Sequence, residues 1–292
     1  MLRNVEGYAE LTVSMPVHGL SRDVTIPYVM GSQANERSDD PSILMFMGMG
    51  EEHRAAATSA TRTLETCGLP TASFMLPFKG FTPEELPWLV REAPVLIAKE
   101  LDSRHSDSKT RAIAGNSRGG GIALIAAGEA PELFSAAAAL SPAAVANRYL
   151  GETTGKRRQA LIRDLGIKNP FLQLPSLANT RAALYTGSEI WGHRKAGTLT
   201  EALDYALSDG LATLAAYGIA AMIAANKPVK VFAAARDPLF RTNYLRDAIG
   251  LDFSHLIEVI PGAHATVASR LGRKQLAIMG RWLASRVLSP AA

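Results

Sequence analysis

Residues 110–127 read TRAIAGNSRGGGIALIAA, and this stretch decides the fold that the sequence predicts. The segment Thr110 to Ala114 is expected to form a strand, and Arg118 to Ala127 a helix. Between them stands Gly115-Asn116-Ser117-Arg118-Gly119, a G-x-S-x-G pattern. In so sharp a turn, side chains two residues on either side of the serine would collide, so glycine suits both positions. The pattern and its strand-to-helix setting make Ser117 a candidate nucleophile.

A glycine-rich phosphate-binding turn is the alternative interpretation of the same stretch. It is disfavoured because the chain shows neither G-K-[ST] after these glycines nor a G-x-G-x-x-G pattern.

On both sides of this stretch, the sequence alternates between apolar runs and helical patterns. Glu10 to Val17 and Asp23 to Met30 predict two strands joined by a hairpin turn at His18-Gly19. Further strands are predicted at residues 43–47, 71–76, 134–140, 229–235 and 256–260, and helices at 51–67, 82–101 (with a kink at Pro94), 239–249 and 265–288. This order predicts an α/β fold with a mostly parallel central sheet flanked by helices.

One segment, Asn147 to Asp209, interrupts the alternation. It mixes Lys, Arg, Gly and Pro with short helical runs, and it is too apolar for a bare linker. We therefore expect residues 1–146 and 210–292 to form the core and residues 147–209 to form a helical lid.

A serine nucleophile needs a base, and His264 is the best placed of the six histidines. It follows the last predicted strand, so it is expected at the carboxyl edge of the sheet, where Ser117 also lies. Asp237 directly follows the strand before it and is the expected orienting acid. Asp252 is the alternative, although it precedes a strand rather than following one. The order Ser117, Asp237, His264 is the order of serine, acid and histidine in the α/β-hydrolase motif.

The oxyanion of an acyl-transfer intermediate requires two backbone amides. Arg118, directly after the serine, is expected to supply one. Met49, in the turn Met47-Gly48-Met49-Gly50 after the strand at 43–47, is expected to supply the other. Gly48 and the Arg118 side chain are candidate substrate contacts. Alternatively, Arg118 is a solvated residue that covers the helix end.

Together these motifs resemble the α/β-hydrolase superfamily from about Glu10 to Leu288. Met47 departs from the pattern, since many members have histidine before the oxyanion-loop glycine. Gly115-Asn116-Ser117 also resembles carbon–carbon bond hydrolases that cleave dienoic acids. The resemblance implies a serine hydrolase that uses no cofactor and no metal.

Bulk composition limits the partners. The net charge is +4 and no block of like charges is present, which disfavours nucleic acid. The single cysteine, Cys67, excludes an internal disulfide. No apolar leader opens the chain, and the longest uncharged run, Gly210 to Ala225, is shorter than the about 20 residues of a membrane span. We expect a soluble, cytoplasmic protein.

The substrate expected from the sequence is a small apolar carboxylic ester or thioester, cleaved through an acyl-enzyme on Ser117. A carbon–carbon hydrolase or an acyltransferase could use the same three residues. A hydrolase-fold protein that only binds a small ligand is the alternative outside enzymes. The sequence leaves the oligomeric state open.

Overall fold

The structure is a computed structural model of the 292-residue chain. It describes residues 7–17, 20–31, 41–48, 51–77, 81–82, 84–104, 111–143, 209–237 and 242–288. The predicted lid, apart from Asp209, lies outside these residues, as do the His18-Gly19 turn and Met49.

The described residues contain an eight-stranded sheet in the order β1-β2-β4-β3-β5-β6-β7-β8. The first two strands are antiparallel to their neighbours, and β4 to β8 with β3 run parallel. The prediction of a mostly parallel sheet flanked by helices is therefore confirmed. The strands are β1 (Gly7–Val17), β2 (Leu20–Met30), β3 (Ile43–Phe46), β4 (Thr71–Phe74), β5 (Arg111–Asn116), β6 (Phe134–Leu140), β7 (Val229–Ala234) and β8 (Ile257–Ile260).

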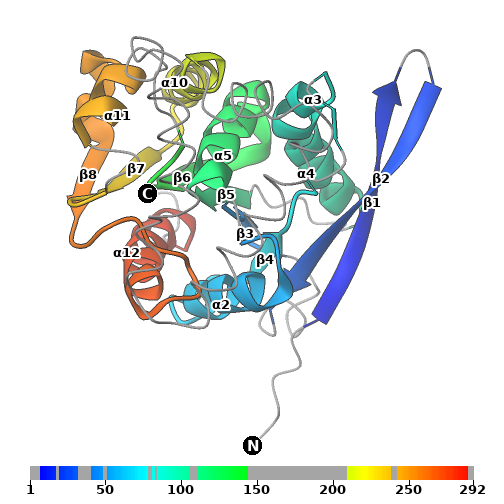
Figure 1. Cartoon of the computed structure of the whole chain (residues 1–292), viewed down its shortest axis with the longest axis horizontal. Coiled ribbons are helices and arrows are strands. Elements are labelled where there is room, and N and C mark those ends of the chain that lie inside the picture. Colours follow the sequence, from blue (N-terminus) through cyan, green and yellow to red (C-terminus); the bar gives the residue numbers. More distant parts are fainter. Residues whose placement is uncertain are drawn as a thin grey trace, which may run out of the picture.

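Strand β1 shows why an alternating pattern forms a half-buried strand. Leu11, Val13 and Met15 are buried, and the residues between them are exposed. The whole strand pairs with β2, from Gly7 opposite Met30 to Val17 opposite Leu20. Figure 1 shows this hairpin in blue, reaching beyond the rest of the sheet.

Helices cover both faces of the sheet (Figure 1). Helices α2 and α12 pack together on one face, and the other helices pack on the opposite face. The helices are α2 (Arg54–Glu65), α3 (Leu86–Arg91), α4 (Ala93–Arg104), α5 (Arg118–Glu129), α10 (Asp209–Ala224), α11 (Thr242–Ile249) and α12 (Arg270–Val287), with short 3₁₀ helices η1 (Pro131–Leu133) and η3 (Leu251–Leu256).

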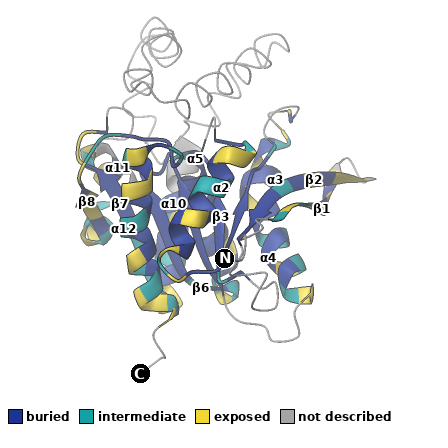
Figure 2. Cartoon of the chain, turned by 90° about the horizontal axis from the view of Figure 1, so that it is seen from below, coloured by how far each residue is buried: buried dark blue, intermediate teal, exposed yellow. Residues whose placement is uncertain are grey.

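The central strands are buried on both sides, as their uninterrupted apolar runs predict. In β3, Ile43 and Met45 face the layer of α2 and α12, whereas Leu44 and Phe46 face the opposite layer. Figure 2 shows these strands dark blue between helices whose outer surfaces are exposed. In the part of the chain described, no helix is long and apolar enough to cross a membrane.

Three predicted helix boundaries were wrong. The helix predicted at 82–101 begins at Leu86 and is divided at Glu92, because Pro94 has no N–H with which to continue the first segment. The helix predicted from Glu51 begins at Arg54, with His53 as its N-cap. The helix predicted from Ala265 begins at Arg270. The later starts of α2 and α12 leave loops at the edge of the sheet where Ser117 lies.

Candidate active site

Ser117 occupies the turn between β5 and α5 with φ 54° and ψ −123°. A positive φ is unfavourable for a residue with a Cβ and costs on the order of 1–3 kcal/mol, so the surroundings must hold it. The Ser117 N–H donates to the Leu140 carbonyl at 2.8 Å, and its carbonyl accepts from Gly120 and Ala143 at 2.9 Å each. These contacts anchor the turn to the end of the neighbouring strand β6.

The two glycines of the pentapeptide are required by close backbone contacts. A Cβ on Gly115 would lie 2.0 Å from the Gly119 carbonyl oxygen, and a Cβ on Gly119 would lie 2.1 Å from the Phe46 carbonyl oxygen. Any side chain at either position would displace backbone. The close approach of backbone atoms therefore explains why both positions are glycine.

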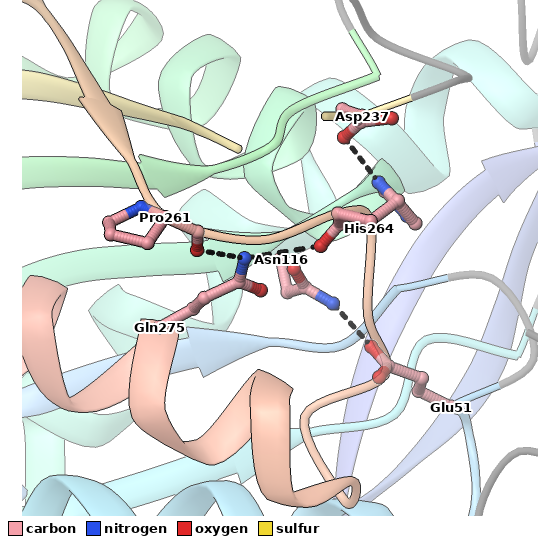
Figure 3. Close-up of polar contacts among 7 residues, drawn as sticks. Glu51, Asn116, Asp237, Pro261, His264 and Gln275 are labelled. Carbon is pink, nitrogen blue, oxygen red and sulfur yellow. Dashed lines mark hydrogen bonds and ion pairs between the residues drawn. The ribbon is translucent and has the colours of Figure 1, made fainter. Parts of the chain in front are cut away.

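Asp237 and His264 lie in the loops that follow β7 and β8. Their side chains are 0% and 3% exposed, and His264 Nδ1 lies 2.8 Å from Asp237 Oδ2 (Figure 3). A buried carboxylate in this position fixes the ring and favours a proton on Nδ1, which leaves Nε2 as the basic nitrogen. Asp252, the alternative acid, is exposed in η3, and its backbone carbonyl contacts His255.

The loop that carries His264 is held from two sides. Gln275 of α12 donates its Nε2 to the carbonyls of Pro261 and Ala263, each at 3.1 Å (Figure 3). On the other side, the Arg236 N–H donates to the Gly262 carbonyl at 2.8 Å. No sequence motif indicates Gln275, because the carbonyls that it contacts are 14 and 12 residues away.

Glu51 is a second buried carboxylate at this edge, and it belongs to none of the predicted site motifs. Its Oε2 accepts from Asn116 Nδ2 at 2.8 Å (Figure 3) and from the Gly48 N–H at 3.2 Å. Its Oε1 accepts from the Val267 N–H at 2.5 Å. Burial raises the pKa of Glu51, although these donors and the charge of His264 act in the opposite direction.

Arg118 is buried rather than solvated, with 4% of the residue exposed. Its guanidinium forms an ion pair with Glu52, which is also buried. A cation at the N-terminus of α5 opposes the helix dipole, and the Glu52 carboxylate compensates for it. The acid that pairs with Arg118 therefore comes from the loop after β3.

Gly48 lies against the Ser117 turn. A Cβ on Gly48 would be 3.0 Å from Ser117 Cβ and 3.0 Å from the Asn116 carbonyl oxygen. The loop after β3 therefore lies close to the serine turn. Met49, the expected second oxyanion donor, lies outside the described residues.

The remaining described histidines lie elsewhere: His53 caps α2 by accepting the Ala56 N–H at its Nδ1, and His255 is exposed. Within the described ranges, no group of three or more His, Cys, Asp or Glu side chains could hold a metal ion.

The chain is similar to known proteins in part of its sequence and in its fold. Residues 87–208 match a family model named Esterase, with the description "Putative esterase". No curated protein matches the sequence. A carboxylesterase structure from the thaumarchaeon Nitrososphaera gargenis superposes with a TM-score of 0.61 and 14% identity, over 95% of this chain and 99% of that chain.

Two further solved structures have the same architecture. A protein from Acinetobacter baumannii AYE, described as a putative lipase, aligns with a TM-score of 0.60 and 15% identity, over 96% of this chain and 92% of that one. The 2-hydroxy-6-oxo-6-phenylhexa-2,4-dienoate hydrolase of Rhodococcus sp. strain RHA1 aligns at 0.51 and 16%, over 97% and 100%. The chain has the α/β-hydrolase fold. In this α/β-hydrolase-fold protein, Ser117, Asp237 and His264 follow β5, β7 and β8 at the carboxyl edge of the sheet.

Proposed function

We propose that this protein is a serine hydrolase that cleaves a carboxylic ester or thioester through an acyl-enzyme on Ser117. The observation that carries the proposal is the buried Asp237–His264 pair in the two loops beyond β7 and β8. The Ser117 turn, with its positive φ, ends a strand of the same sheet and supports the same interpretation. The match of residues 87–208 to the Esterase model agrees with this chemistry.

In the proposed mechanism, His264 takes the Ser117 proton as the serine oxygen attacks the acyl carbon. The resulting imidazolium then gives the proton to the leaving alcohol or thiol. Asp237 keeps the ring in the required tautomer and stabilises its positive charge. The backbone amides of Arg118 and Met49 are proposed to bind the oxyanion. Water, activated by His264, then releases the acid and restores Ser117.

The proposed substrate has an apolar acyl part, which residues 147–209 would bind as a lid. Gly48 and Arg118 remain candidate substrate contacts in this proposal. Hydrolysis of a carbon–carbon bond and transfer to an alcohol are the competing reactions of the same residues. A panel of esters, thioesters and dienoic acids, each with and without an added alcohol, distinguishes these reactions by their products.

The test is labelling with an organophosphonate followed by peptide mapping, since only an activated serine reacts at neutral pH. We expect one adduct, at Ser117, and a loss of ester turnover of about 10⁴-fold or more in Ser117→Ala. Ser141→Ala is the matched control. Ser141 also has a positive φ, 42°, and directly follows β6. An adduct at another residue would assign the nucleophile to that residue instead of Ser117. No adduct at all would exclude an activated serine and favour a ligand-binding function.

A further inference from the structure

The Glu51 carboxylate is the point where three segments of the candidate site meet. Gly48 belongs to the loop after β3, Asn116 is the residue before Ser117, and Val267 follows His264 by three residues. Two of these donors are backbone amides, and the third is the Asn116 side chain. One side chain therefore connects the oxyanion loop, the serine turn and the histidine loop.

This arrangement is costly for the fold. A carboxylate that is 2% exposed loses nearly all of its hydration, and burial accordingly raises the pKa of Glu51. An amide or an apolar side chain of similar size would avoid that desolvation cost. Because all three of these donors to Glu51 lie in segments that carry a proposed catalytic residue or oxyanion donor, the desolvation cost falls at the candidate site rather than in the general core.

The contact with Gly48 also bears on the oxyanion. The Gly48 N–H already donates to Glu51, so the second donor must come from another amide of the loop. The next amide in the chain is that of Met49. Glu51 would thus fix the orientation of the peptide that precedes the proposed donor.

We propose that Glu51 is a positioning residue that holds the oxyanion loop, the Ser117 turn and the His264 loop in register for acyl transfer. The inference rests on the proposed function. In the reaction, the Ser117 proton passes to His264 and then to the leaving group, and no proton passes to Glu51. The residue therefore acts only through the groups it holds.

Glu51→Gln tests the proposal, since it keeps the size of the side chain and removes its charge and one acceptor. We expect kcat to fall about 10- to 100-fold, as for small misplacements of reacting groups, while KM changes less than about twofold. The nearby Arg118–Glu52 pair is unchanged by the substitution.

Glu65→Gln is the matched control. Glu65 is also buried and ends α2, where its carboxylate packs against Gly31. This variant should keep the kcat and the KM of the wild type. The proposal is overturned if Glu51→Gln retains wild-type kcat, if only KM changes, or if both glutamine variants lose kcat equally.

Asn116→Ala provides a second test, because it removes one of the three contacts, keeps Glu51 itself, and should by itself lower kcat. It should lower kcat by less than Glu51→Gln does, and the double variant should lose less than the product of the two effects. If the two effects multiply fully, Asn116 and Glu51 act independently and the proposal is overturned.

Phosphonate labelling of the wild-type enzyme at Ser117 tests the proposed function separately. Its failure would reject the proposed function, whereas intact labelling with an unaffected Glu51→Gln would reject only this inference.

Discussion

Asp237 Oδ2 lies 2.8 Å from His264 Nδ1, although the two residues come from separate loops 27 positions apart. Neither side chain has appreciable contact with solvent. Water therefore does not compete for the contact, and the imidazole has one preferred orientation. The turn at Arg236, whose N–H donates to the Gly262 carbonyl, ties the two loops together at their base.

Asp237→Asn is expected to lower kcat by about 10⁴-fold, because an amide at this position favours the wrong histidine tautomer. The shape of the side chain is preserved, so the midpoint of thermal unfolding should change little. Steady-state turnover of a chromogenic ester and a melting curve measure the two effects. Asp252→Asn is the control, since Asp252 is exposed and should tolerate the change. Reversed results for the two variants would assign the orienting acid to Asp252.

Because Arg118 is paired with Glu52 inside the protein, we expect substitution of Arg118 to lower the stability of the fold. Arg118→Ala would remove the cation from a buried carboxylate, which typically costs about 3–5 kcal/mol of unfolding free energy. Urea unfolding measures that cost. The double variant Arg118→Met with Glu52→Leu should recover much of it, because no buried charge is left behind.

The same Arg118→Ala variant tests the substrate contact. If Arg118 serves only Glu52, a neutral ester and an ester with a distal carboxylate should lose turnover equally. A selective loss for the anionic ester would show instead that the guanidinium binds substrate.

Much of this fold could be predicted because its signals are local. β3 and β6 are continuous apolar runs, and each was predicted to within one residue. The G-x-S-x-G turn is also local, since its glycines relieve contacts within a few residues and with one neighbouring strand. The expected positions of Asp237 and His264 followed from one rule, that residues after parallel strands gather at a common edge.

Glu51 could not be found in this way. Its partners Asn116 and Val267 are 65 and 216 residues away, and no local pattern encodes such contacts. In sequence, Glu51 and Glu52 resemble ordinary acids at the start of a helix, where the dipole favours negative charge. The structure instead begins α2 at Arg54 and places both acids in the loop before it. The start of α2 was misplaced and Glu51 was missed for the same reason, namely that both acids fit the pattern of a helix N-terminus.

The raised pKa of Glu51 predicts how stability depends on pH. The native state holds the Glu51 proton more tightly than the unfolded chain does, so the contribution of Glu51 to wild-type stability decreases as pH rises above the usual glutamate value of about 4.3. Glu51→Gln lacks this dependence. The unfolding free energy of the variant, relative to the wild type, should therefore increase with pH across that window. Urea titrations at pH 4, 6 and 8 would measure it.

Ser59→Ala is the control for this pH dependence. Ser59 Oγ donates to the Val267 carbonyl, so the variant disturbs the same loop without removing a titratable group. Its stability difference from the wild type should stay constant over the pH range. A constant difference for Glu51→Gln as well would contradict the raised pKa.

A glycine pair sets the distance between α5 and α10. A Cβ on Gly218 would lie 2.0 Å from the Leu124 carbonyl oxygen, and a Cβ on Gly128 would lie 2.2 Å from Gly218 Cα. The helices must therefore separate to accept any side chain, and we expect Gly218→Ala to lower the unfolding free energy by about 1–3 kcal/mol despite its better helix propensity. Tyr217→Ala, at the neighbouring position that is 62% exposed, should cost far less. Urea unfolding measures the unfolding free energy of both variants. A Gly218→Ala protein as stable as the wild type would show that the contact between the helices is not tight.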